Sequence, residues 1–316
     1  MALIETSGLT KHYGPVKALD KLDLSVEPGI IGLVGANGAG KSTLIKILLG
    51  LLTPTSGTAT VLGMDSVRET RAIRQVVGYM PEHDCLPPDV GATDFVTHMA
   101  RISGLPRTAA RERTAEVLRH VGLYEERYRQ IGGYSTGMKQ RVKLAQALVH
   151  DPKVLLLDEP TNGLDPAGRD EMLDLIKRTG TDFGITVVVA SHLLGEIEQV
   201  GTYLVAIDAG RLLSAAPITT YTARTPVLAV EVEEGSDRLA ASLTGRGFKA
   251  RLDGDCVLVA MEDERLYDAI RDTVADLALP LIRIQQERGR LEDLFRDGAP
   301  SIGAPSIDGP AEGSVQ

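Results

Sequence analysis

A glycine-rich loop between a strand and a helix limits the folds open to this chain. The loop runs from Gly35 to Ser42 with the sequence GANGAGKS, after the apolar run 30–34 and before the helix-like run 43–49. The spacing G-x-x-x-x-G-K-S lets successive backbone N–H groups surround an anion, because glycine adopts conformations that a Cβ forbids and the helix N-terminus adds its positive end. The sequence therefore predicts a nucleotide phosphate site on a strand–loop–helix unit.

Two residues of this loop have specific expected roles. Lys41 is expected to reach the β- and γ-phosphates, and Ser42 is expected to bind Mg²⁺. The alternative, a glycine-rich turn that binds nothing, is disfavoured by the strand before the loop and the helix after it. The residues predicted to bind nucleotide here are Gly35, Asn37, Gly38, Gly40, Lys41, Ser42 and Thr43.

A second apolar run ends in two carboxylates. Residues 154–157 read VLLL and are followed by Asp158 and Glu159. This pattern predicts a buried parallel strand that delivers the acids to the carboxyl edge of a sheet. Asp158 suits Mg²⁺, and Glu159 suits the water that attacks the γ-phosphate. A strand ending in Asp-Glu is common by itself, and the phosphate loop gives it this meaning.

The segment 134–138 precedes an amphipathic helix and reads YSTGM. The chain resembles the nucleotide-binding subunits of ABC transporters, whose signature LSGGQ lies at the head of such a helix. Ser135 and Gly137 match the signature, whereas Tyr134, Thr136 and Met138 depart from it. Without the phosphate loop, Ser-x-Gly before a helix would be only an N-cap and a permissive glycine.

The resemblance covers roughly residues 1–215 and implies roles for three further residues. Tyr13 matches the aromatic that stacks on adenine, against the alternative of an aromatic packed on a strand. Asp165, in the run 163–165, matches a loop that touches the partner subunit, although such a run also marks an ordinary turn. His192 follows the apolar run 185–190 and matches a histidine that contacts the γ-phosphate; the alternative is a structural histidine.

Glu82 departs from the pattern of most ABC ATPases, which place a Gln there in contact with Mg²⁺ and water. A carboxylate binds the metal more strongly than an amide, but it adds negative charge beside Asp158 and Glu159. We therefore expect greater repulsion in the nucleotide-free protein. Glu82 and the Tyr-Ser-x-Gly-Met signature together resemble the drug-resistance exporter ATPases, in particular the daunorubicin-resistance type, so an exporter is expected.

The resemblance also implies cofactors and partners. ATP and Mg²⁺ are the expected cofactors, with Ser42, Asp158 and Glu82 on the metal and Lys41, Glu159 and His192 in catalysis. In the family, the signature of one subunit closes over the ATP of the other, so the expected partners are a second copy of the chain and a multi-spanning membrane permease.

Composition excludes several other classes. The net charge of −9 over 316 residues argues against nucleic-acid binding, which needs a basic surface. Apolar runs such as 48–52 fall short of the ~18–20 residues of a membrane span, and no signal peptide is expected. Cys85 and Cys256 form no disulfide framework. We therefore expect a location at the cytoplasmic face of the membrane, reached through the permease.

The predicted fold class is α/β, a P-loop NTPase core of the ABC-ATPase type with a small α+β domain after it. The expected ATP-binding domain spans 1–216, with a helical subdomain at about 93–150, and a linker spans 217–226. Residues 227–296 show the order β-α-β-β-α-β of a ferredoxin-like domain, for which regulation or dimer support is expected. The motif 291–295 resembles the end of exporter extensions, and 297–316 is predicted to be disordered.

Two other functions compete with the transporter subunit. One is a soluble ABC-type ATPase that acts as a mechanochemical regulator outside transport; such proteins usually carry two ATPase cores or a long coiled-coil insertion, and neither is visible in the sequence. The other is a nucleotide sensor that does not hydrolyse ATP. It is disfavoured by the intact set Lys41, Asp158, Glu159 and His192.

Overall fold

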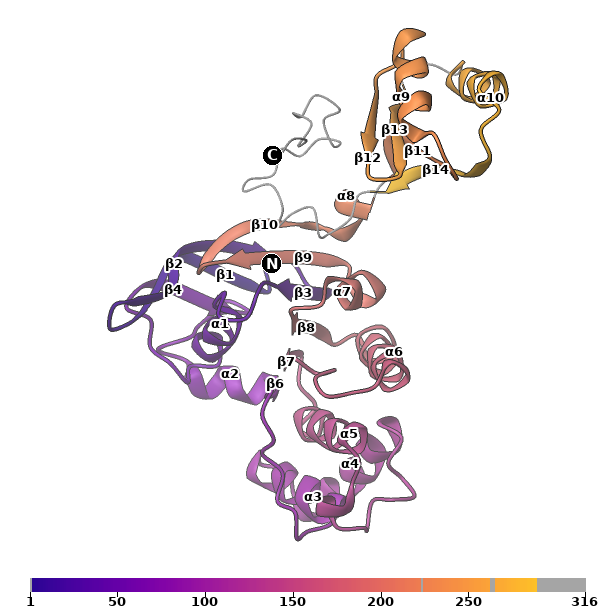
Figure 1. Ribbon diagram of the computed structural model, residues 1–316. Coiled ribbons are helices and arrows are strands. Elements are labelled where there is room, and N and C mark those ends of the chain that lie inside the picture. Colours follow the sequence, from indigo (N-terminus) through magenta and orange to yellow (C-terminus); the bar gives the residue numbers. More distant parts are fainter. Residues whose placement is uncertain (1, 223, 262–264, 289–316) are drawn as a thin grey trace. The chain divides into compact units, whose positions relative to one another are not determined.

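The computed structural model describes residues 2–222, 224–261 and 265–288, which form two compact units (Figure 1). The first unit ends at Ile218 and the second begins at Thr219. The predicted fold class is confirmed, because the first unit is an α/β nucleotide-binding core and the second is a small α+β domain.

The core of the first unit is a six-stranded sheet in the order β10-β9-β3-β8-β7-β6. All neighbouring pairs are parallel except β10 with β9 at one edge. Strands β3 and β7 are buried along their whole length, which explains their continuous apolar runs. The bounds are β3 (Ile30–Val34), β6 (Val77–Met80), β7 (Val154–Asp158), β8 (Thr186–Ser191), β9 (Tyr203–Asp208) and β10 (Arg211–Pro217).

An antiparallel sheet in the order β2-β1-β4-β5 covers the helix that follows the phosphate loop. Burial alternates at the start of β1, so one face of this sheet enters the core. Leu9 and Leu22 of this sheet share one apolar cluster with Ile45 of α1 and Leu156 of β7. The bounds are β1 (Ile4–Tyr13), β2 (Val16–Val26), α1 (Lys41–Leu48), β4 (Ser56–Val61), β5 (Met64–Asp65) and α2 (Thr70–Val76).

A group of helices lies between β6 and β7 in the chain and apart from the antiparallel sheet (Figure 1). It comprises α3 (Ala92–Ile102), α4 (Arg107–His120), the 3₁₀ turn η1 (Ile131–Gly133) and α5 (Thr136–Leu148). These elements occupy the segment 93–150 that was expected to be helical. The helices α6 (Pro166–Phe183) and α7 (Leu194–Val200) follow β7 and β8.

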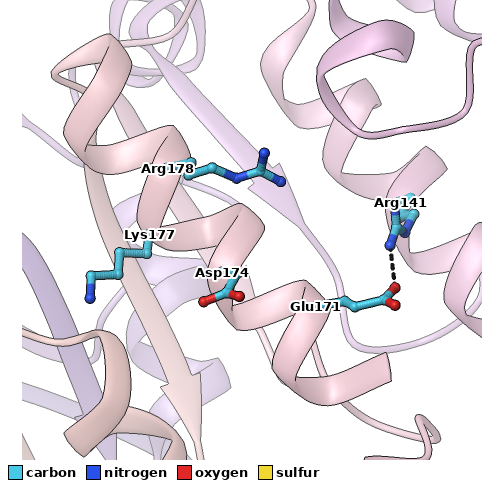
Figure 2. A pocket seen from close by; sticks show the side chains of 5 residues that line it. All are labelled: Arg141, Glu171, Asp174, Lys177 and Arg178. Carbon is cyan, nitrogen blue, oxygen red and sulfur yellow. Dashed lines mark hydrogen bonds and ion pairs between the residues drawn. The ribbon is translucent and has the colours of Figure 1, made fainter. Parts of the chain in front are cut away.

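Arg141 joins three of these helices. Figure 2 shows its guanidinium on α5 facing Glu171 of α6, and the two groups lie 2.7 Å apart. A second guanidinium nitrogen donates to the carbonyl of Val121, just after α4, at 2.9 Å. Both side chains of the pair are partly exposed, so the ion pair contributes little to the stability of the fold. Its main effect is to orient α5 relative to α6. The pocket in Figure 2 is lined by Arg141, Glu171, Asp174, Lys177 and Arg178.

The second unit has the predicted ferredoxin-like topology. Its strands are ordered β12-β13-β11-β14 and all neighbouring pairs are antiparallel. Leu239 of α9 and Ile270 of α10 pack with Val230 and Val257 in one apolar cluster, so both helices cover one face of the sheet. The bounds are β11 (Arg224–Val232), α9 (Ser236–Gly245), β12 (Ala250–Asp253), β13 (Cys256–Ala260), α10 (Leu266–Asp276) and β14 (Leu281–Arg288).

The sequence predicts a linker, a short motif and a tail on the C-terminal side of the chain. The segment 217–226, expected as a linker, contains the short helix α8 (Ile218–Thr222) and the start of β11. The motif 291–295 and the tail 297–316 lie outside the described residues. Within the described part of the chain, every helix is too short or too polar to cross a membrane.

His120 attaches α4 to α6 through a half-buried ring. The hydroxyl of Thr179 donates to the Leu175 carbonyl at 2.8 Å, so the His120 Nε2–H donates to the Thr179 oxygen, also at 2.8 Å. The ring meets Phe183 edge-on at 4.7 Å. Burial lowers the pKa of His120, and the nearby cations Arg178 and Arg113 lower it further, whereas Asp182 opposes them.

We predict that the unfolding free energy of the first unit falls as the pH drops through about 6.5. The unfolded chain takes up a proton on His120 that the folded chain resists, so acid favours unfolding. His120→Gln keeps an N–H donor without the ionisation, and it should flatten the slope of unfolding free energy against pH. Urea unfolding between about pH 7.5 and about pH 5.5 measures this slope. His83→Gln, at an exposed histidine, is the control; equal slopes for His120→Gln and the wild type would contradict the prediction.

Candidate nucleotide site

The residues predicted to contact the phosphates and the metal lie at or just after the carboxyl ends of four neighbouring strands. In the order β3-β8-β7-β6, the register pairs Val34 with Ser191, Ala190 with Asp158, and Leu157 with Met80. The strands therefore end at one level. The segments after them carry, in the same order, the phosphate loop, His192, Glu159 and Glu82.

The phosphate loop lies between two backbone segments that leave no room for side chains. A Cβ on Gly35 would lie 2.2 Å from the carbonyl oxygen of Ile207, and one on Gly40 would lie 2.6 Å from that of Ala18. Gly40 also has φ 111°, in the region that favours glycine. The N-terminus of α1 follows directly. This arrangement fits a phosphate, because small residues let an anion approach the backbone at a helix N-terminus.

Lys41 is a buried cation that faces its own loop. Its side chain is only 6% exposed, and the Nζ atom donates to the Gly35 carbonyl at 2.6 Å. The same atom lies 3.6 Å from the Oε1 atom of Glu159. A phosphate in the loop would therefore meet a preformed ammonium group.

Ser42 and Asp158 lie together on the acidic side of the site. The Ser42 hydroxyl is 3.3 Å from the Oδ1 atom of Asp158. Burial raises the pKa of Asp158; the Ser42 hydrogen bond and Lys41 oppose this effect, and the charges of Glu82 and Glu159 add to it. A hydroxyl and a carboxylate suit Mg²⁺, which typically takes one or two protein carboxylates and completes its shell with water and phosphate oxygens. The donor set therefore fits this ion.

Glu159 connects the phosphate loop to His192. Its Oε2 atom accepts from the Nδ1 of His192 at 2.8 Å, while its Oε1 atom faces Lys41. The residue has φ 49°, which is uncommon for a residue with a side chain. It is 6% exposed, and its N–H donates to the Ala190 carbonyl at 2.9 Å. These contacts hold the carboxylate between a cation and an imidazole and maintain the strained backbone of Glu159.

Glu82 and Tyr79 lie on the far side of Asp158 from Lys41 in the strand order. Burial, together with the charges of Asp158, Cys85 and Glu82, raises the pKa of Tyr79 to about 12. The Tyr79 phenol therefore stays protonated at neutral pH. The Glu82 carboxylate is half-buried and raises the pKa of Asp158. The site thus carries more negative than positive charge around Asp158.

The signature residues form a second group with the 163–165 turn. Ser135 caps α5, its hydroxyl oxygen accepting from the Met138 N–H at 3.3 Å, and Asp165 caps α6 in the same way. A Cβ on Gly163 would lie 3.3 Å from the Thr136 methyl, and one on Gly137 would lie 3.7 Å from Leu164. Ser135 and Asp165 are exposed. The two N-caps are therefore next to each other on the surface.

Tyr13 lies at the end of β1 and is 48% exposed, with the Lys11 ammonium 5.4 Å from the ring centroid. It pairs with Val16 at the start of β2. The same strand brings Ala18 against Gly40. Tyr13 is therefore on the hairpin that reaches the phosphate loop.

Three buried polar residues connect the site loops and were not predicted. Glu196 accepts from the hydroxyls of Thr161 at 2.8 Å and Ser191 at 2.9 Å, and so joins the segments next to Glu159 and His192. Gln140 and Lys143 of α5 donate to loop carbonyls. Their contacts join segments far apart in the chain, so no local pattern points to them.

Comparisons with known proteins, by sequence and by structure, point to one family. The family described as ABC transporter matches residues 19–162. The bacitracin transport ATP-binding protein of Bacillus licheniformis is 41% identical over 68% of this chain and 70% of its own length. The daunorubicin/doxorubicin resistance ATP-binding protein of Streptomyces peucetius is 39% identical over 67% of this chain and 64% of its own length. A bacterial ABC transporter cassette with a dimeric structure has a TM-score of 0.62 and 25% identity over 68% of this chain and 98% of its own.

We predict that Glu82→Gln raises the melting temperature of the nucleotide-free protein. The change removes a charge that repels Asp158, and roughly 1 kcal/mol of relief corresponds to about 2–4 °C for a unit of this size. Calorimetry without nucleotide or metal measures the shift. Asp89→Asn makes the same charge change at an exposed position of the same loop and serves as the control. An unchanged or lower melting temperature in Glu82→Gln would show that repulsion is not the dominant effect of this carboxylate.

Proposed function

The chain belongs to the ABC transporter family as an ATP-binding protein, and from this we propose that it hydrolyses Mg-ATP to drive export through a membrane permease. The observation that carries the proposal is the contact of Glu159 with both Lys41 and His192. It places a cation, a carboxylate and an imidazole at the loop that fits the phosphates. Relatives named for bacitracin transport and for daunorubicin/doxorubicin resistance support export.

In this proposal the phosphate loop and Lys41 bind the β- and γ-phosphates, and Tyr13 stacks on the adenine. Ser42, Asp158 and Glu82 would hold Mg²⁺, with the first two already in contact. The ion, when bound, neutralises charge on the phosphate oxygens. Gly35, Asn37, Gly38, Gly40 and Thr43 complete the nucleotide-binding set.

Glu159 is the proposed general base that activates the attacking water. Its carboxylate contacts both Lys41 and His192, and these contacts orient it to accept a proton from the water. Binding of the phosphates by Lys41 weakens its hold on Glu159, because the ammonium then has a more highly charged partner. The Nδ1 atom of His192 is engaged by Glu159, which leaves Nε2 for the γ-phosphate.

A second copy of the chain is the proposed partner at the exposed N-caps. The signature segment, with Ser135 and Gly137, packs against the turn that ends at Asp165. A helix N-terminus with a free face is suited to a phosphate presented by another molecule. The dimeric ABC cassette supports this arrangement. ATP would then join the two copies, and its hydrolysis would release them.

The domain assignment follows from the same proposal. Residues 1–216 would form the ATP-binding domain, with 93–150 facing the permease, and 227–296 would form an accessory domain. We place the assembly at the cytoplasmic face of the membrane, where the permease holds the chain. The competing soluble regulator has no feature in the described residues that favours it.

We predict that Glu159→Gln abolishes ATP turnover and traps an ATP-bound dimer. The amide keeps the shape of the side chain but is a far weaker base, so turnover should fall by about 10²–10⁴-fold. Light scattering at saturating Mg-ATP measures the dimer. Glu112→Gln, the same change at an exposed position of α4, should retain turnover and serves as the matched control. A Glu159→Gln protein that stays monomeric would contradict the dimer scheme.

Affinity purification from gently solubilised membranes tests the transport assignment. A multi-spanning protein in stoichiometric amount, identified by mass spectrometry, is the expected companion. Co-purification with ribosomes or DNA-associated proteins, and no membrane protein, would favour the soluble regulator instead.

A further inference from the structure

One face of α5 holds the loop that carries Glu82. Lys143 is 3% exposed, and its Nζ atom donates to the carbonyls of Pro81 at 2.7 Å and of Glu82 at 2.9 Å. One turn earlier on the same face, Lys139 lies 3.7 Å from the Oδ2 atom of Asp84. Two lysines therefore contact the same short segment. Lys143 contacts its buried backbone carbonyls, and Lys139 contacts the partly exposed side chain of Asp84.

The two contacts differ in energetic weight. Removing an ammonium group from water is costly unless hydrogen bonds replace the water, and Lys143 donates two such bonds to carbonyl groups. Both carbonyls belong to the turn after β6, so the buried cation fixes the path of the backbone there. The Lys139 and Asp84 side chains lie 3.7 Å apart and are partly exposed, and such ion pairs contribute little to stability.

The same helix also contacts the loop after Glu159. The Gln140 amide is 5% exposed and donates to the Asn162 carbonyl at 3.0 Å. Gln140 and Lys143 are three residues apart, so they lie on one face of α5. Ser135 caps the N-terminus of this helix. One rigid helix thus connects the exposed N-cap to the backbone of both acidic loops.

We propose that Lys143 is a positioning residue that sets the place of Glu82 in the metal site according to the position of α5. The proposal rests on the proposed function, in which Ser135 engages ATP held by the second copy. When that contact moves α5, the two hydrogen bonds of Lys143 move the Glu82 backbone with it. Closure of one nucleotide site is then transmitted to the metal ligand of the other site, through a contiguous path of helix and hydrogen bonds.

The test compares Lys143→Met with Lys139→Met in the full chain. Both changes remove one positive charge from the same face of α5. Binding of a fluorescent ATP analogue, titrated with Mg²⁺, reports the metal site without requiring turnover. For Lys143→Met we expect the Mg²⁺ concentration at half-saturation to rise about tenfold, while metal-free nucleotide affinity stays within about twofold. For Lys139→Met both quantities should stay within about twofold of the wild type.

A double-mutant cycle with Glu82→Ala, which removes the side-chain oxygens altogether, separates positioning from general loosening of the fold. If Lys143 acts through the Glu82 side chain, Lys143→Met should have little further effect on the Mg²⁺ dependence in the Glu82→Ala background. Additive effects, or an unchanged Mg²⁺ dependence in Lys143→Met, would overturn the proposal. Lys143→Gln keeps an uncharged N–H donor group on a shorter side chain and should give an intermediate shift; it replaces Lys143→Met if that variant does not fold.

The outcomes also distinguish this inference from the proposed function. Absence of Mg-ATP hydrolysis in the wild-type protein would remove the proposed function itself. Normal hydrolysis in the wild type, together with a Lys143→Met protein that titrates with Mg²⁺ like the wild type, would remove the role of Lys143 alone.

Discussion

The level register of β3, β8, β7 and β6 is the constraint on which the site depends. Parallel pairing brings four segments that are distant in the chain to one edge of the sheet, and the register makes β3, β8 and β7 end together. A shift of one residue in β7 would turn Asp158 away from Ser42, because successive side chains point to opposite faces. The full burial of β3 and β7 fixes this register, since both faces of each strand are packed.

Charge is distributed unevenly across this edge. On the side of the phosphate loop, Lys41 is balanced by Glu159 and by carbonyl groups of its own loop. On the other side, burial raises the pKa of Asp158 and the charge of Glu82 raises it further, while the ammonium of Lys143 offsets only part of this negative charge. An anion is therefore matched to one side and a divalent cation to the other. Mg-ATP carries both charges in one complex, so the charge pattern of the protein suits this ligand better than either ion alone.

The strands, the phosphate loop and the ferredoxin-like order were predictable because their signals are local: apolar runs, glycine spacing and alternation. The long-range contacts were not. Lys143 lies between Val142 and Leu144, and its acceptor in Glu82 is 61 positions away in the chain. Glu196 accepts from Thr161, 35 positions earlier. A charged residue on a helix is expected to face water, and only the fold shows which carbonyls replace that water. The strained backbone of Glu159 likewise has no local signal.

The two interpretations of Ser135, as the N-cap of α5 and as a signature residue that contacts ATP, are compatible. As an N-cap, the hydroxyl oxygen accepts from the Met138 N–H, which uses a lone pair and leaves the hydroxyl hydrogen available. The side chain is exposed, so that hydrogen can be donated to an anion outside the chain. Capping also fixes the rotamer and therefore lowers the entropy lost when an external phosphate binds. A residue that stabilises its own helix is in this way already oriented for the proposed contact with a nucleotide presented by a second copy.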